Sequence, residues 1–340
     1  MSNNMLLSIC IPTYNREKCL RDAINSVLPQ LNDGIELIIS DNASSDNTKN
    51  VVKDFLDANS SKNIIYFRND SNLGLDGNVL NLVNLAKGKY ILFLGDDDLL
   101  IKGSLAYVSK FLAGNVAMIF LNWQHLSPDG SVPWRFSDMK KDLYFNDKDK
   151  FLGFLGCYVS FISATLINRT LVYEAIARYN LLRFIGKGQI HYYISLAISS
   201  IKPQNFDLIF ASQLCVSRRP DPNQPWNIFN AFGTVVIELF KNIEEFGYDH
   251  KLTKKIINAI LIDYVFMGAI VTICQAKVAN DKLSVFFRNV YKENRGNVLF
   301  WLLVCPVFCI PKSVIRFFYR LYRKYRKEKK TCRVYARAVV

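Results

Sequence analysis

The sequence lacks paired cysteines, internal repeats and low-complexity tracts. Its eight cysteines are scattered, none forms a C-x-x-C pair, and none has a histidine at the spacing of a zinc site. Cys10 and Cys274 lie inside apolar runs, which is typical of buried thiols in a reducing compartment. Cys157 has no detectable base partner, so the pattern excludes a thiol nucleophile.

A leader and a clear membrane span are also missing. The first residues have neither the basic region nor the apolar run of a signal peptide, so we expect cytoplasmic residence. Residues 256–274 are apolar for about one membrane thickness, but Asn258 and Asp263 within them favour a buried bundle helix. Residues 298–310 form a shorter apolar run broken by Pro306, which predicts a core or interfacial segment.

Basic charge is concentrated at one end of the chain. The net charge is +14, yet residues 312–340 alone contain eleven Lys or Arg and one Glu. The rest of the chain is close to charge balance and contains no recognised nucleic-acid module, so we expect no nucleic-acid partner. The basic tail therefore needs a different explanation.

The tail has the spacing of an amphipathic helix. Apolar and aromatic residues recur at helical intervals on one face, and cations recur on another. The two sets are Val314, Phe318, Leu321 and Tyr325, and Arg316, Arg320, Arg323 and Lys327. This pattern predicts a helix that lies in the headgroup layer of an anionic membrane. A solvated basic helix packed on the domain, or an RNA-binding tail, is the alternative.

The first hundred residues alternate between apolar strands and amphipathic helices. Strands are expected at 6–11, 35–40, 64–68 and 90–94, and helices at 17–28, 45–57 and 78–86. Continuous apolar strands alternating with helices predict an α/β fold, with a mostly parallel sheet and helices on both faces. Further strands are expected at 116–122, 161–168 and 208–216, and residues 226–296 are predicted to be mostly helical.

Polar residues follow each of the first four predicted strands. Ligands of open α/β sheets bind beyond the carboxyl ends of the strands, so these segments should converge at one edge. The segments are Pro12-Thr13-Tyr14-Asn15-Arg16, Asp41-Asn42-Ala43-Ser44, residues 69–78, and Gly95-Asp96-Asp97-Asp98.

The acidic triplet Asp96-Asp97-Asp98 indicates a bound cation. Three adjacent carboxylates repel one another, and a divalent metal with a diphosphate would compensate that repulsion. A solvated turn that caps the following helix is the alternative, because Asp is a good helix cap.

These segments resemble family 2 of the glycosyltransferases, which have the GT-A fold. The matching stretches are SICIPTYNR (8–16), LIISDNASSDNT (37–48) and NDSNLGLDGNVLNLVNLAKGKYILFLGDDDLL (69–100), in the family's order and spacing. The strong match covers about residues 5–105. The combination SDNAS, NLG and GDDD is similar to the subgroup that adds deoxysugars such as abequose during O-antigen assembly.

The resemblance implies a nucleotide-sugar site. The first strand end would line the base and ribose pocket, Arg16 would reach phosphate, and Asp41 would read the base. Its neighbour Asn42 is assigned to the same nucleotide-sugar site. The loop after the third strand would lie under the ribose and diphosphate. The residues concerned are Pro12, Thr13, Tyr14, Asn15, Arg16, Asp41, Asn42, Asn72, Gly74 and Asn78.

The metal motif departs from the family pattern. Asp97 matches the carboxylate that holds Mn²⁺ or Mg²⁺ in the family's D-x-D motif, but the usual first Asp aligns with Gly95. Either Asp96 or Asp98 takes the missing role, or the ribose contact is lost. We assign Asp96 to the nucleotide sugar, and Asp98 to the metal together with Asp97.

The catalytic base is also unusual. Family members often carry an Asp in an E-D pair about 90 residues beyond D-x-D, and here His191 falls at that place. Histidine has an unperturbed pKa near 6.5 and can accept a proton, so His191 is the predicted base. A helix-face histidine bonded to a neighbour is the alternative, and Asp138 or Asp142 would then be candidates.

Two further groups of residues allow two readings each. Trp123, His125 and Trp134 could form an acceptor platform, although core packing is favoured. Arg218-Arg219 could hold phosphate or form a solvated turn.

Three parts are therefore expected along the chain. They are a GT-A nucleotide-sugar-binding catalytic domain at 1–225, a helical region at 226–311 and a membrane-associating tail at 312–340. The expected function is metal-dependent transfer of a hexose or deoxyhexose from a nucleotide-diphosphate donor to a lipid-linked or cell-surface glycan. The expected location is peripheral, at the inner face of the cell membrane. The alternative is a degenerate, non-catalytic scaffold subunit that binds glycan or nucleotide sugar.

Overall fold

The chain divides into two compact units. The computed structural model describes residues 5–127, 129–132, 134–219, 236–266, 269–270, 287–288, 290–327 and 333–334. One unit contains residues 1–223 and 332–340, and the other contains residues 224–331. The boundary predicted after residue 225 lies outside the described residues.

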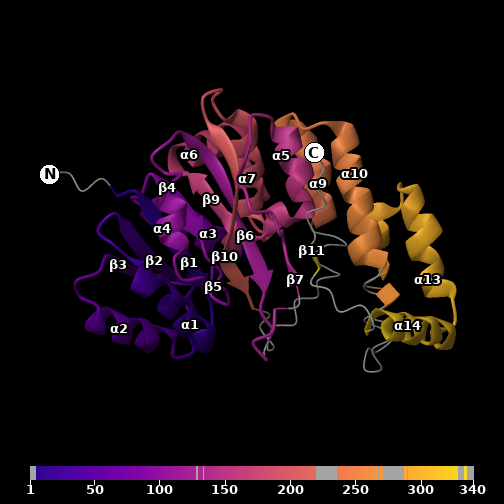
Figure 1. The fold of residues 1–340 in the computed structure, drawn as a ribbon, viewed down its shortest axis with the longest axis horizontal. Helices are drawn as coiled ribbons and strands as arrows, with labels where there is room; N and C mark the ends of the chain where they lie inside the picture. The colour runs from indigo at the N-terminus through magenta and orange to yellow at the C-terminus, as the bar shows by residue number, and fades with distance from the viewer. Residues whose placement is uncertain are drawn as a thin grey trace. The chain divides into compact units, whose positions relative to one another are not determined.

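Four parallel strands form the N-terminal half of the sheet in the first unit. β1 (Leu7–Thr13) pairs with β2 (Ile35–Asp41) on one side and β4 (Tyr90–Phe93) on the other, and β3 (Ile64–Arg68) continues beyond β2 (Figure 1). Every residue of β1 and β2 is buried. The predicted parallel strands are thus confirmed; β1, β2 and β4 are fully covered, whereas β3 is partly exposed.

The remainder of the sheet is mixed. β9 (Thr165–Asn168) runs antiparallel between β4 and β6 (Val116–His125), and β10 (Asp207–Arg218) is parallel to β6. Shorter strands complete it: β5 (Leu99–Leu100), β7 (Trp134–Arg135), β8 (Leu143–Phe145) and β11 (Arg333–Val334). Residues 161–164, predicted as strand, belong instead to the turn that contains η3 (Ile162–Ala164). This difference matters because the turn carries Ser163 to the acidic motif.

The helices of the first unit pack on the sheet and on one another. They are α1 (Glu17–Val27), α2 (Thr48–Ala58), α3 (Gly74–Leu85), α4 (Ser104–Ser109), α5 (Lys148–Leu155), α6 (Arg169–Tyr179) and α7 (Ile190–Ile201). α1 lies beside α2, and α6 lies beside α7 (Figure 1). The predicted apolar face of α1, which includes Leu20 and Ile24, is buried.

Helix α3 starts earlier than the sequence pattern predicted. It begins at Gly74 rather than Asn78, and the Gly74 φ of +71° is a left-handed conformation that glycine adopts without strain. The early start places Asp76 in the first turn of the helix and Asn78 one turn beyond its start. Both side chains are buried, so the helix presents two polar groups to the protein interior.

The described residues of the second unit are mostly helical. Its helices are α9 (Ile237–Asn242), α10 (His250–Ile260), α13 (Cys305–Cys309) and α14 (Lys312–Lys327), with π-helical turns at Leu261–Phe266 and Phe300–Val304. Among the described residues, no single helix is long and apolar enough to cross a membrane. One pair bent by 111°, Phe300–Cys309 with Lys312–Leu321, satisfies the length and composition of a span when taken together.

Candidate active site

The four polar segments meet at the carboxyl edge of the parallel strands. Thr13, at the end of β1, donates its Oγ1 proton to Asp96 Oδ2 over 2.8 Å, although 83 residues separate the two. Asn42, just past β2, donates from Nδ2 to Asn72 Oδ1 over 2.7 Å. The predicted convergence of these strand ends is confirmed.

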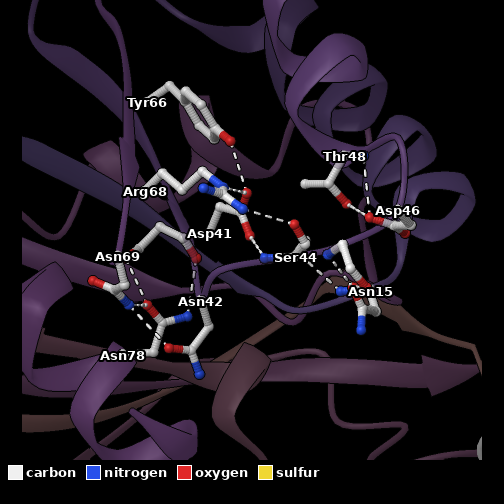
Figure 2. Close-up of polar contacts among 12 residues, drawn as sticks. Asn15, Asp41, Asn42, Ser44, Asp46, Thr48, Tyr66, Arg68, Asn69 and Asn78 are labelled. Carbon is white, nitrogen blue, oxygen red and sulfur yellow. Dashed lines mark hydrogen bonds and ion pairs between the residues drawn. The ribbon is translucent and has the colours of Figure 1, made fainter. Parts of the chain in front are cut away.

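Asp41 is fixed in a dedicated cradle. Its side chain is fully buried, Tyr66 donates its hydroxyl proton to Asp41 Oδ2 over 2.7 Å, and the Ser44 backbone N–H donates to Oδ1 over 2.8 Å. Arg68 Nε lies 3.4 Å from Oδ2 (Figure 2). Burial and the bond to Asp41 raise the pKa of Tyr66 well above its usual value, so this phenol stays a donor at neutral pH.

A network of amide side chains builds the floor beside Asp41. Asn42 Oδ1 accepts from Asn69 Nδ2 and from the Leu73 backbone N–H, while Asn42 Nδ2 also donates to the Gly74 carbonyl. Asn78 Oδ1 accepts from the Ser40 hydroxyl over 2.6 Å. It also accepts from Asn69 Nδ2 over 3.1 Å (Figure 2). Asn42 and Asn78 therefore hold the loop after β3 against the end of β2.

Tyr14 and Asn15, just past the end of β1, are more exposed to solvent than Asp41 and Asn42. Tyr14 is 41% exposed, and Asn15 adopts a left-handed φ of +53°. The Asn15 backbone N–H donates to Ser44 Oγ, and Asn15 Oδ1 accepts from the Ser45 backbone N–H over 2.7 Å. Asn15 thus fixes the turn after Asp41, and Tyr14 faces outward next to it.

The three carboxylates of the acidic turn have different environments. Asp96 is buried on Thr13 and Arg16, and Asp98 is buried with Ser163 Oγ donating to its Oδ2 over 2.5 Å. Burial, opposed by Arg16, raises the pKa of Asp96 to about 6. Burial and the charge of Asp97 raise the pKa of Asp98 far above its ordinary value. Only the carboxylate of Asp97 is appreciably open, with 25% of its side chain exposed.

Two arginines border the acidic turn. Arg16 Nη1 lies 2.7 Å from Asp96 Oδ1 and 3.0 Å from Asp97 Oδ2. Arg219 approaches from past the end of β10: its backbone N–H donates to Asp98 Oδ1 and its Nε donates to the Asp97 carbonyl. Its Nη1 also lies 2.7 Å from Asp22 Oδ2. Of the arginine pair that allowed two interpretations in the sequence, Arg219 therefore contacts the acidic turn, and the charge of Arg218 also acts on the pKa of Asp98.

Gly95 has a steric reason for interrupting the usual acidic motif. A Cβ at this position would lie 3.1 to 3.2 Å from Asp97 Oδ1, Asp98 Oδ2 and Ser163 Oγ. The Gly95 backbone N–H donates to Ser163 Oγ over 2.8 Å, and Ser163 in turn donates to Asp98. Close packing of this turn on η3 therefore favours glycine.

His191 is buried in the first turn of α7. Its Nε2 lies 3.3 Å from the Ser160 carbonyl oxygen, and its Nδ1 has no partner among the described residues. Burial lowers the pKa of His191 to about 4, so the imidazole is neutral at pH 7. Accepting a substrate proton would require Nδ1 to become accessible, and the role of His191 as base stays a prediction.

The other sequence candidates occupy varied places. Asp142 accepts from Tyr107 and from Ser212, and Asp138 pairs with Arg135 at the surface. Trp123 is 2% exposed and packs edge-on against Trp134, whose ring stacks on His125. Trp123 is thus a core residue.

Several residues of the site had no signal in the sequence. Tyr66 and Arg68 lie inside a predicted strand, and nothing in the sequence indicates that both contact Asp41. Ser163 lies 65 residues beyond Asp98 in a segment predicted as strand. Only the tertiary pairing of β4 with β9 brings that segment to the acidic turn.

Comparison with known proteins agrees with this geometry. The model of glycosyl transferase family 2 matches residues 8–175, which contain every strand-end segment of the site. This part of the chain is therefore a family 2 glycosyltransferase domain, and it has the GT-A fold.

Curated relatives match shorter stretches. Abequosyltransferase RfbV of Salmonella typhimurium is 47% identical over 110 residues, which are 32% of this chain and 33% of that protein. The GalNAc(5)-diNAcBac-PP-undecaprenol beta-1,3-glucosyltransferase of Campylobacter jejuni is 33% identical over 165 residues, covering 47% of this chain and 52% of that protein. The chain thus spans a third to a half of the length of these relatives.

Solved structures resemble the fold at low sequence identity. TarS 1–349 of S. aureus in complex with UDP has a TM-score of 0.59 and 15% identity, covering 94% of this chain and 92% of that chain. The mannosyltransferase PcManGT of Pyrobaculum calidifontis, in complex with GDP-Man and Mn2+, has a TM-score of 0.52 and 13% identity, covering 94% and 87%. These likenesses support the fold.

Proposed function

We propose that this protein transfers a hexose or deoxyhexose from a nucleoside-diphosphate donor to a hydroxyl of a lipid-linked or cell-surface glycan, in O-antigen or capsule-type synthesis. The observation that carries the proposal is the meeting of a buried, cradled Asp41 with the Arg16–Asp97 pair at one sheet edge. The cradled Asp41 fixes the turn beside this pair, and an arginine next to an open carboxylate suits a diphosphate with its cation.

The donor would lie across the ends of β1 and β2. Tyr14 and the Pro12–Thr13 strand end would line the base and ribose. Asp41 could read the base edge only by giving up some of its bonds to Ser44, Tyr66 and Arg68. The Asn72–Gly74 loop, held by Asn42 and Asn78, would support the ribose and diphosphate. Arg16 would reach the phosphates, and Asp96 holds Arg16 in position.

The residues present fit a divalent cation bound mainly through the donor. Within the described part of the chain, no three His, Cys, Asp or Glu side chains gather into a ready metal cage. Asp97 has an open carboxylate, whereas both Asp98 oxygens already accept protein hydrogen bonds. Mg²⁺ and Mn²⁺ sites at phosphates commonly use one or two carboxylates together with phosphate oxygens and water. We therefore assign Asp97 as the protein ligand, and Asp98 could join it only by giving up those bonds.

The chemistry follows from charge that develops on the leaving diphosphate. As the bond to the sugar breaks, negative charge grows on the nucleoside diphosphate, and Arg16 lies where it can stabilise that charge. A bound cation would supply the same stabilisation. A base must take the proton of the acceptor hydroxyl, and His191 remains our candidate.

The acceptor and the location are proposed from relatives and from α14. The name of the Campylobacter relative specifies an undecaprenol-linked glycan, which supports a lipid-linked acceptor here.

In α14, Phe317 and Phe318 are 54% and 63% exposed, on a helix that also carries Lys312, Arg316 and Arg320. Exposed aromatic rings on a cationic helix fit an anionic membrane surface, which we propose is the cytoplasmic face. The side chains of Arg323, Tyr325 and Lys327 lie outside the described part.

Calorimetric titration with UDP, GDP, CDP and dTDP, each with and without Mn²⁺, tests the donor site. We expect one nucleotide to bind, and to bind more tightly with Mn²⁺. The absence of metal-dependent heat with all four would contradict the proposed metal-dependent transferase. The matching sugar donors are then assayed for hydrolysis and for transfer to GlcNAc-diphosphoundecaprenol.

A non-catalytic scaffold that binds nucleotide sugar is the second candidate. It is favoured by the buried, neutral His191 and by Gly95 in the acidic motif. A scaffold would bind the nucleotide without turnover, so binding with neither donor hydrolysis nor transfer would select it.

A further inference from the structure

Asp76 forms a three-bond clamp on a distant loop. One carboxylate oxygen, Oδ2, accepts from the backbone N–H groups of Gly186 over 2.8 Å and of Gly188 over 2.7 Å. The other oxygen accepts from the Ile190 backbone N–H over 2.9 Å. Because Asp76 is 2% exposed, the whole carboxylate is committed to these three donors, and it is poorly placed to accept a proton from substrate.

The clamped loop needs both of its glycines. Gly186 and Gly188 have φ values of +90° and +70°, in the left-handed region where a side chain is strained. Two left-handed residues let alternate N–H groups turn toward the same carboxylate. The conformation of residues 185–190 therefore depends on Asp76 and on the two glycines together.

The clamp joins two parts of the proposed site. At one end, Asp76 lies in the first turn of α3, and Asn42 bonds the carbonyl of Gly74 two residues earlier. At the other end, the loop leads into His191, which contacts the carbonyl of Ser160. The turn from Ser160 continues to Ser163, which bonds Asp98. The loop thus spans from the nucleotide loop to the acidic turn.

We propose that Asp76 is a positioning residue that holds loop 185–190 as the acceptor-side wall of the active site. This inference rests on the proposed function. Ile185, which is 46% exposed, and the exposed Lys187 lie on the open part of the loop, where an incoming glycan acceptor would contact it. Asp76 itself acts through the loop and does not touch the reacting atoms.

The Asp76→Asn variant tests the clamp directly. Asparagine keeps the size of the side chain, but it loses the negative charge and one acceptor oxygen. Hydrogen exchange followed by mass spectrometry should show residues 186–190 exchanging faster in the variant, while the β1–β2 peptides remain protected. Unchanged exchange at 186–190 would overturn the clamp.

Kinetics separate positioning from general destabilisation. With the donor and GlcNAc-diphosphoundecaprenol, we expect Asp76→Asn to lower kcat/KM for the acceptor on the order of 10- to 100-fold. Nucleotide affinity and donor hydrolysis by water should stay within about twofold of the wild type. Equal loss of both activities, or of neither, would overturn the acceptor role.

Two glycine variants make the test independent of Asp76. Gly188→Ala should reproduce the same selective loss, because alanine is strained at φ +70°. Gly103→Ala is the matched control: its φ is +86°, nothing crowds its Cβ, and it precedes α4 in another part of the unit. The control should lose some stability but keep the ratio of transfer to hydrolysis. If the wild type binds no nucleotide, the proposed function fails and the acceptor role fails with it, whereas the exchange data still report on the clamp.

Discussion

Asp97 differs from its two acidic neighbours in having an open carboxylate, which contacts Arg16. Its neighbours already accept hydrogen bonds from the protein. Asp96 accepts from Thr13 and Arg16, and Asp98 accepts from Ser163 and the Arg219 backbone N–H. Asp97 is therefore the member of the triplet that can bind a ligand, because its carboxylate faces outward.

Asp97→Asn is expected to abolish transfer while the fold survives. The amide is isosteric but cannot neutralise a divalent cation, so we expect at least about a 100-fold loss of kcat and loss of Mn²⁺-dependent nucleotide binding. The thermal midpoint should hardly change, because the side chain is partly exposed. Asp57→Asn, an exposed charge change on α2, is the control. Retained activity in Asp97→Asn would move the metal site elsewhere.

Gly95→Asp would restore the first acid of the usual motif, yet we expect it to harm the protein. A Cβ would crowd three oxygens at 3.1 to 3.2 Å, and a fourth carboxylate would add repulsion. We expect a loss of about 1–3 kcal/mol in the free energy of unfolding, measured with urea, and no gain in transfer. Gly95→Ala isolates the steric part. Higher activity in Gly95→Asp would refute our account of this glycine.

His191 should make the protein sensitive to acid. Its folded pKa is about 4, below the unfolded value near 6.5, so the unfolded chain binds the extra proton between these values. Stability from this group is complete above about pH 6.5 and falls as pH drops toward about 4, by up to roughly 3 kcal/mol.

Urea unfolding from pH 7 to 4 measures this acid sensitivity. In His191→Gln, which cannot titrate in this range, the loss of stability over the same interval should be smaller. Parallel profiles for the variant and the wild type would contradict a buried, neutral imidazole.

At the scale of elements, the ends of β1 and β2 depend on α3 for their geometry. Asn42 alone makes hydrogen bonds to Asn69, Asn72, Leu73 and Gly74, so one side chain ties the strand end to the start of the helix. In the chain, α2 and β3 lie between the end of β2 and the start of α3.

Asn42→Ala should therefore weaken both the fold and the donor site. Removing the amide leaves buried polar partners unsatisfied, which we expect to cost about 2–3 kcal/mol in unfolding free energy. Nucleotide affinity should fall by about tenfold as the loop loosens. Asn50→Ala, which changes an exposed amide on α2, is the control. Unchanged affinity in Asn42→Ala would mean that the loop does not contact the nucleotide.

At the scale of the whole molecule, nucleotide binding and membrane binding are assigned to different units. The strand-end site belongs entirely to the first unit, and the exposed aromatic residues of α14 belong to the second. The two activities should therefore be separable by mutation.

Truncation after Pro311 should release the protein from vesicles of anionic lipid. Because it also removes β11 from the sheet of the first unit, nucleotide binding is measured alongside to show that this unit is intact. The double variant Phe317→Ser and Phe318→Ser should weaken co-sedimentation by several-fold, because insertion of aromatic rings is lost. Tyr144→Ser removes an aromatic residue of 60% exposure from the first unit and is the control. Full vesicle binding by the truncated chain would refute the membrane contact.

The predictable part of the site consists of residues that lie next to their function in the sequence. Strand ends such as Thr13, Asp41 and Asp97 follow apolar runs, and a parallel sheet necessarily gathers such ends at one edge. Asp76 was hidden because its partners begin 110 residues later. Ser163 was hidden because the apolar run around it resembles a strand but folds as a turn.

The sequence by itself determined the α/β order, the edge where the site lies and the acidic turn, because local apolar periodicity and polar strand ends encode these features. Tertiary structure decided which carboxylate faces outward, why position 95 is glycine, and how Asp76 and Ser163 reach loops far along the chain. Those features depend on burial and on contacts between segments that are distant in sequence, and no local pattern records either.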